Sequence, residues 1–135
     1  MYHKILIVGN LGRDPEMRYT QSGQAVTNFS VATSRQYNNS AGEQVKETLW
    51  FRVSVWGRQA ETTNQYLKKG SSVLVEGRMI ATPEGNPRVW ERQDGTSAAS
   101  FEVTANLVRF LSKSNSSNGT EEEVVLEVEE DEIPF

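Results

Sequence analysis

Apolar and polar residues alternate along much of the first 111 residues, a period of two that is typical of half-buried β-strands. The ranges that carry this pattern or a short apolar run, and that we predict as strands, are 4–8, 25–34, 45–57, 72–81 and 99–111, and the short range 16–20 alternates as well. On the last strand, one face is expected to hold Phe101, Val103, Ala105, Leu107 and Leu111. Loops are predicted at 9–15 and 35–44. A hairpin connection at 82–87 would let 89–92 continue the strand before it.

One range, 58–69, has the spacing of a helix instead, and Gly70 is expected at its C-terminal end. The helix residues expected to share one face are Ala60, Thr63, Asn64 and Leu67. The predicted order is therefore about three strands, one helix and then two strands. This order matches a five-stranded Greek-key barrel of the OB type, an all-β fold with one helix. A β-sandwich is the main alternative, but it needs about seven strands and has no natural place for the helix.

The strand at 45–57 carries the most informative pattern. The face expected to point into the core is uniformly apolar and consists of Leu49, Phe51, Val53 and Val55. The opposite face consists of Thr48, Trp50, Arg52, Ser54 and Trp56. Two large aromatic side chains on the solvent side of a strand predict a binding surface. The alternative is that loops, the helix or another subunit cover them.

Indole rings stack on nucleobases of any sequence, and also on sugar rings, so nucleic acid and oligosaccharide are both candidate ligands. Basic residues favour nucleic acid, because neutral sugars do not require them. The basic residues on strands or loops of the same region are Arg18, Arg35, Lys46, Arg52, Arg78, Arg88 and Arg92. Tyr37, in the predicted loop at 35–44, and Trp90, beside another predicted loop, would enlarge the aromatic set to four.

The distribution of charge divides the chain into a body and an end. Residues 1–112 hold 13 Lys and Arg against 10 Asp and Glu, whereas residues 113–135 hold one Lys against eight acids. A mildly basic body with a strongly acidic end is typical of a nucleic-acid-binding domain with an interaction tail. We therefore predict one domain at 1–111, a flexible linker at 112–120 and a disordered acidic partner-binding tail at 121–135.

Several stretches together identify a family that the chain resembles. They lie at 7–19, which contains Gly-Asn-Leu-Gly-Arg-Asp-Pro, and at 32–34, 50–61, 66–71, 75–78 and 131–135. In these stretches the chain closely resembles the bacterial single-stranded-DNA-binding proteins of the homotetrameric replication type. The resemblance covers almost the whole body and the acidic tip, and it implies an OB barrel and an assembly of four subunits.

The resemblance also implies roles for particular residues. Bases would stack on Tyr37, Trp50, Trp56 and Trp90, of which Tyr37 stands where Trp is common and Trp56 where Phe is common. The cations predicted to bind DNA beside them are Arg18, Arg35, Lys46, Arg52, Arg78 and Arg92. The tip expected to dock replication, recombination and repair proteins is Asp131, Glu132, Ile133, Pro134 and Phe135. Such a protein would protect exposed single strands and recruit enzymes to them.

No catalytic site, metal or cofactor is predicted. The chain has no Cys and one His, which rules out a Cys–His pair and a two-His metal site, and it has no phosphate-binding glycine motif. It has no secretory segment and no apolar run of membrane-spanning length, so we expect a cytoplasmic, nucleoid-associated protein. The alternatives are an OB-fold replication adaptor and an enzyme. The resemblance implies that such adaptors lack an acidic Ile-Pro-Phe end, which argues against the first. The absence of a catalytic constellation argues against the second.

Overall fold

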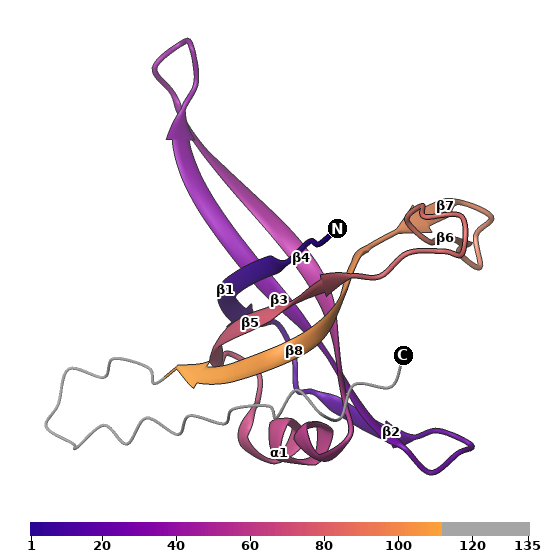
Figure 1. Ribbon diagram of the computed structural model, residues 1–135. Coiled ribbons are helices and arrows are strands. Elements are labelled where there is room, and N and C mark those ends of the chain that lie inside the picture. The colour runs from indigo at the N-terminus through magenta and orange to yellow at the C-terminus, as the bar shows by residue number, and fades with distance from the viewer. Residues whose placement is uncertain (112–135) are drawn as a thin grey trace, which may run out of the picture.

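Five strands form a closed barrel in the computed structural model, which describes residues 1–111 (Figure 1). In order around the barrel they are β1 (Ile5–Leu11), β5 (Ser72–Met79), β8 (Phe101–Leu111), β4 (Gln44–Trp56) and β3 (Ala25–Asn38). The barrel closes where the end of β1 pairs with β3, with Leu11 opposite Val31. β4 and β8 run parallel, and the other neighbours are antiparallel. This arrangement confirms the predicted five-stranded barrel of the OB type.

Two extensions project from the barrel (Figure 1). The outer parts of β3 and β4, with the turn between them, form a two-stranded ribbon that we define as residues 33–49. β6 (Val89–Glu91) and β7 (Ser97–Ala99) form a separate hairpin, which we call the arm. β2 (Glu16–Tyr19) adds a strand beside β3, and α1 (Arg58–Tyr66) follows β4.

Inward-facing aliphatic side chains fill the barrel. Val53 and Val55 of β4 are buried, as predicted, and Phe51 packs against this core. The prediction that Leu49 joins them is wrong, because β4 has left the barrel at this position and the Leu49 side chain is exposed. The helix presents Ala60 to the barrel, and its carbonyl oxygen accepts a hydrogen bond from the buried Thr27 hydroxyl.

The predicted loop at 35–44 is wrong over half of its length. β3 continues to Asn38 and β4 begins at Gln44, so only residues 39–43 form the turn. Within the turn, Asn39 Oδ1 accepts hydrogen bonds from the backbone N–H of Ala41 (3.0 Å) and Glu43 (2.9 Å). A ribbon that has left the barrel has no apolar core face along its outer part, and so it lacks the alternation that marks a strand in the sequence.

The predicted loop at 9–15 also begins too early, since β1 continues to Leu11. Gly9 explains how β1 reaches β3. A Cβ atom built on Gly9 would lie 2.2 Å from the carbonyl oxygen of Ala32, so only glycine permits this close approach of the two backbones. The approach occurs where the barrel closes.

The last strand does not keep one apolar face. The register between β5 and β8 shifts between Glu76 and Gly77, which indicates a β-bulge. Val103 is buried before the shift, whereas Val108 is buried and Phe110 packs on the core after it. The prediction that Phe101, Val103, Ala105, Leu107 and Leu111 share one face is therefore wrong beyond Ala105.

Two further boundaries differ from the prediction. Residues 89–92 do not continue β5; Trp90 lies opposite Ala98 in the arm. The helix ends at Tyr66, because Leu67 is extended (φ −89°, ψ 145°), and Gly70 (φ 85°) belongs to the turn that follows.

The predicted linker at 112–120 and acidic tail at 121–135 lie outside the described residues. Among residues 1–111, no helix has the length and apolar character needed to cross a membrane.

Candidate nucleic-acid interface

The outer face of β4 carries two exposed tryptophans. The Trp50 side chain is 50% exposed and that of Trp56 is 38% exposed, with Arg52 exposed between them. The intervening Val53 and Val55 are buried, so the alternation of the strand fixes the direction of both indoles. The prediction that these rings face outward is confirmed.

A groove of about 630 Å³ lies beside the middle of β4, and we call it the basic groove. Its positively charged residues are Arg13, Arg18, Arg52 and Arg88. Its acidic residues are Asp14, Glu16 and Glu102. Asp14 Oδ1 accepts a hydrogen bond from the Lys69 backbone N–H (2.8 Å), and Glu102 pairs with Arg88. The arginines come from different segments of the sequence, so the barrel topology is what brings these four guanidiniums to one groove.

A second groove of about 680 Å³ continues from the first, and we call it the apolar groove. Its apolar residues include Leu49, Trp50, Ile80, Pro87 and Phe101. Both grooves are lined by Arg52, Ile80 and Glu102, so the two are contiguous. A cationic surface thus joins an apolar one, the combination required for a ligand with charged and flat apolar parts.

The strand register places Arg18 and Trp56 on the same face. Arg18 of β2 lies opposite Val26 of β3, which in turn lies opposite Trp56 of β4. Val26 is buried between these neighbours. In the next row, the Ser54 hydroxyl donates a hydrogen bond to Asn28 Oδ1 (2.8 Å). The face with Trp56 therefore continues into the basic groove.

The arm brings Trp90 to the same region. The guanidinium carbon of Arg52 lies 5.6 Å from the centroid of the Trp90 ring, and that of Arg88 lies 5.7 Å from it. Both distances are within the range of a cation–π interaction. Of the predicted site residues, the structure therefore gathers Arg18, Arg52, Trp50 and Trp90 around the two grooves, with Trp56 on the same face.

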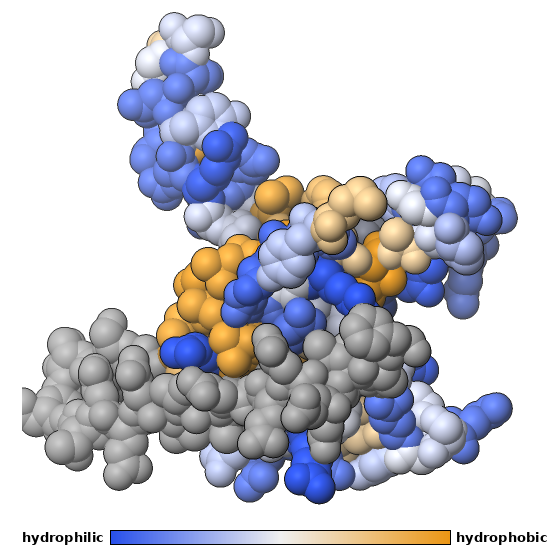
Figure 2. Space-filling view, viewed as in Figure 1, coloured by the Kyte–Doolittle hydropathy of each residue, from blue (hydrophilic) through white to orange (hydrophobic). Residues whose placement is uncertain are grey.

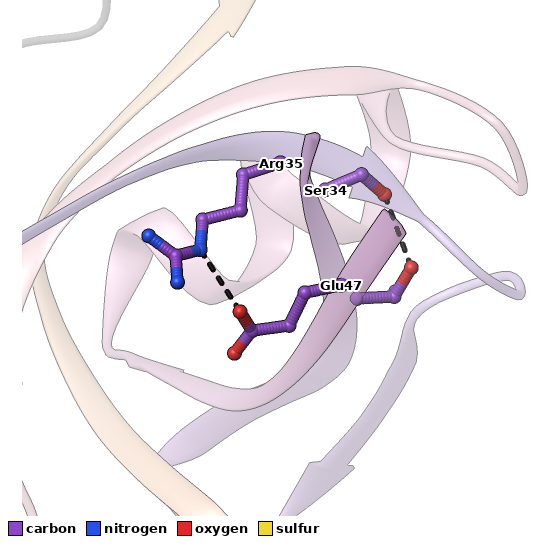
Figure 3. Close-up of polar contacts among 4 residues, drawn as sticks. Ser34, Arg35 and Glu47 are labelled. Atoms are coloured by element: carbon purple, nitrogen blue, oxygen red, sulfur yellow. Dashed lines mark hydrogen bonds and ion pairs between the residues drawn. The ribbon is translucent and has the colours of Figure 1, made fainter. Parts of the chain in front are cut away.

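Tyr37 and Arg35 lie further out on the ribbon and on its other face. The register pairs Tyr37 with Val45 and Arg35 with Glu47. Both side chains therefore lie on the face opposite to the one that carries Lys46 and Trp50. Arg35 Nε donates a hydrogen bond to Glu47 Oε2 (2.9 Å), while the adjacent Ser34 bonds the opposite strand (Figure 3).

The contact with Glu47 has an electrostatic effect on Arg35. This hydrogen bond raises the pKa of the Arg35 guanidinium. The guanidinium carbon also lies 5.0 Å from the centroid of the Tyr37 ring. Arg35 is therefore already engaged by its neighbours on the ribbon.

Two other predicted cations lie outside both grooves. Arg78 is on β5, opposite Thr104 of β8. Arg92 begins the turn of the arm, where its backbone N–H bonds the carbonyl oxygen of Thr96 (2.8 Å). In the same turn, hydrogen bonds from Thr96 lower the pKa of Asp94. Like the other predicted site residues, Arg78 and Arg92 stay predictions as DNA contacts.

Several groove residues were not predicted as part of the site. Among them are Arg13, Ile80, Phe101 and Glu102, and also Arg88, which was counted among the basic residues of the region but not assigned to the site. Arg13 follows a glycine in a stretch that resembles the family, which is a usable signal. The others have no local signal, because long-range strand pairing and the arm bring them to the grooves.

The model of the single-strand binding protein family matches residues 2–111, which include the barrel, ribbon and arm. The chain belongs to the single-strand binding protein family. Members of this family are not enzymes, in agreement with the predicted absence of catalysis. In residues 1–111 no group of three or more His, Cys, Asp or Glu side chains could hold a metal ion.

Individual family members show the extent of the similarity. A single-stranded DNA-binding protein of Neisseria meningitidis is 38% identical over 117 residues, which cover 87% of this chain and 64% of that protein. One of Thermotoga maritima is 40% identical over 132 residues, which cover 98% of this chain and 89% of that protein. The crystal structure of a deletion mutant of the single-stranded DNA binding protein from Thermus aquaticus is similar with a TM-score of 0.65 and 28% identity, covering 82% of this chain and 51% of that chain.

Proposed function

We propose that this protein binds single-stranded DNA with little sequence preference. The observation that carries the proposal is the face of β4, where exposed Trp50 and Trp56 flank Arg52 above two contiguous grooves. Every base has a π-face, so stacking on tryptophan tolerates any sequence. The names of the family members from Neisseria and Thermotoga support DNA as the ligand.

The two grooves suggest how a strand would lie. Phosphates would follow the guanidiniums of the basic groove, while bases would stack on Trp50 beside the apolar groove and on Trp56 and Trp90. Duplex DNA keeps its bases stacked on one another, so it would offer phosphates but no free base faces for stacking. Binding should therefore favour single strands, and its affinity should fall as salt increases.

A titration of intrinsic tryptophan fluorescence tests this function. The ligands are poly(dT), a duplex and a neutral oligosaccharide, each at several salt concentrations. Strong quenching by poly(dT) alone, weakened by salt, is the expected result. Equal quenching by the oligosaccharide, independent of salt, would instead identify a sugar-binding protein.

We propose further that the protein assembles into a homotetramer. Leu6 and Val8 of β1 are exposed, and Figure 2 shows a hydrophobic patch on the barrel in the region where Figure 1 draws β1. Within residues 1–111, β1 pairs with β3 only through Asn10 and Leu11, so no other described strand pairs with that edge of its first part, where a second copy could pair. Sedimentation equilibrium of the wild type and of a Val8→Glu variant tests this, with a tetramer expected only for the wild type.

The cellular role belongs to the same proposal. The protein would protect exposed strands during replication, recombination and repair, in the cytoplasm and at the nucleoid. Its acidic tip, residues 131–135, would dock partner enzymes through Ile133 and Phe135, with the acids favouring a basic rim. Fluorescence polarisation of a labelled 121–135 peptide against purified repair enzymes tests the docking, and a peptide with Phe135→Ala should bind less tightly.

A further inference from the structure

An acidic side chain lies within the positively charged cluster of the basic groove. The Glu102 carboxylate pairs with the guanidinium of Arg88, and its side chain is 11% exposed, against 59% for Arg88. Glu102 also lies opposite Arg52 in the parallel pairing of β8 with β4. Arg52 and Arg88 both approach the ring of Trp90. The carboxylate is therefore paired with one guanidinium of the groove, and its residue is the strand neighbour of Arg52, which also lines the groove.

A carboxylate in this place resembles a bound phosphate. Arginine recognises carboxylate and phosphodiester oxygens through the same donors and geometry. The guanidiniums of Arg52 and Arg88 both lie near the Trp90 ring and repel each other. The carboxylate of Glu102 offsets this repulsion. The anion is part of the protein when no DNA is present, so an entering phosphate has to compete with it.

We propose that Glu102 is a built-in competitor for DNA phosphate that limits the affinity of the basic groove. The inference rests on the proposed function, since it concerns how single-stranded DNA enters the same site. When a phosphodiester reaches Arg88, the guanidinium exchanges the carboxylate for the phosphate. Glu102 thus lowers the affinity for DNA. It also reduces the net number of counterions released on binding, because the displaced carboxylate takes one up.

Glu102→Gln tests the proposal, because the amide keeps the shape of the side chain and removes its charge. Affinity for a dT oligonucleotide should rise about threefold or more at about 50 mM salt. The plot of log affinity against log salt should become steeper by about 0.7, because the Glu102 carboxylate displaced in the wild type takes up a counterion that offsets one released from the phosphates. Glu91→Gln is the matched control, because Glu91 is an exposed carboxylate of the arm that lines neither groove, and it should change neither quantity.

Two more variants complete the test of whether Glu102 acts through Arg88. In Glu102→Gln combined with Arg88→Gln, the gain in slope should disappear, since the freed guanidinium is absent. Glu102→Met serves in place of Glu102→Gln if thermal unfolding shows that the amide variant is not folded. Unchanged or weaker binding by a folded Glu102 variant would overturn the proposal, and weaker binding would mean that Glu102 positions Arg88 for DNA. If the wild type itself binds no single strand, the proposed function fails first.

Discussion

At the scale of single residues, the tilt of the Trp50 ring depends on a glycine in another segment, Gly12. A Cβ atom built on Gly12 would lie 2.5 Å from Cη2 and Cζ3 of Trp50, so the indole packs directly on the backbone there. The Gly12 N–H also bonds the carbonyl oxygen of Ser30 (3.2 Å), which fixes the backbone beneath the ring. Strand alternation determines on which side of the sheet the indole lies, and the contact with Gly12 determines the tilt of the ring.

Gly12→Ala should therefore weaken binding more than it weakens folding. The added methyl group displaces the exposed end of a side chain, which can move at little cost. Gly77→Ala is the comparison, because its Cβ would lie 2.2 Å from the backbone carbonyl oxygen of Thr104, which cannot move freely. Oligonucleotide titration and thermal unfolding should separate the two: lower affinity with near-normal stability for Gly12→Ala, and lower stability for Gly77→Ala. The reverse pattern would contradict the role of Gly12.

Trp50→Ala removes one stacking platform. The expected loss is about 1–3 kcal/mol of binding free energy, which corresponds to roughly a fivefold to 150-fold weaker affinity. The fold should persist, since half of the side chain is in solvent. Trp50→Phe, which keeps a π-face, should lose less. Fluorescence anisotropy of a labelled dT oligonucleotide measures both, and unfolding of Trp50→Ala would place the ring in the core instead.

Strand alternation predicts correctly which residues of β4 face outward, because Val53 and Val55 must be buried and a shift of one residue would expose them. The same rule cannot find Glu102 or Ile80. Each reaches the grooves through its position in a strand or connection whose neighbour lies far away in the sequence. Local periodicity contains no information about such pairings.

At the scale of elements, the ribbon is the largest departure from the prediction. Residues 35–38 form a strand only because they pair with 44–47 across the turn. Their side chains are polar or exposed, and so the sequence there is also compatible with a loop. The bulge in β8 is a similar case, since one unpaired residue reverses the faces without any mark in the hydrophobic pattern.

The ribbon allows a test of which face DNA follows. Lys46 lies on the face of Trp50 and Arg52, whereas Arg35 lies on the opposite face and pairs with Glu47. If the strand continues along the outer face, Lys46→Gln should lower the salt slope of oligonucleotide binding by about 0.7, and Arg35→Gln should change it less. Salt-dependent titrations of both variants provide the measurement. Equal effects would mean that DNA contacts both faces of the ribbon.

At the scale of the whole molecule, the order of elements was sufficient to predict the barrel. Three strands, a helix and two strands leave few compact arrangements, and the core positions of β4 agreed with closure. The grooves could not be predicted in the same way. Their walls come from the loop after β1, from β2, from the segment between β5 and the arm, and from β8, and only the folded barrel brings these together.

The last prediction concerns the charge of the whole chain. Deleting residues 121–135 removes eight carboxylates and changes the formal net charge from −4 to +4. If the acids compete with DNA for the basic groove, the shortened protein should bind oligonucleotides several-fold more tightly at about 50 mM salt, and the difference should shrink as salt rises. A full-length variant in which Gln replaces these acids should behave like the deletion, whereas Phe135→Ala should not, because it leaves every acid in place. Equal affinities of the full-length and shortened proteins at low salt would show that the tail does not compete with DNA.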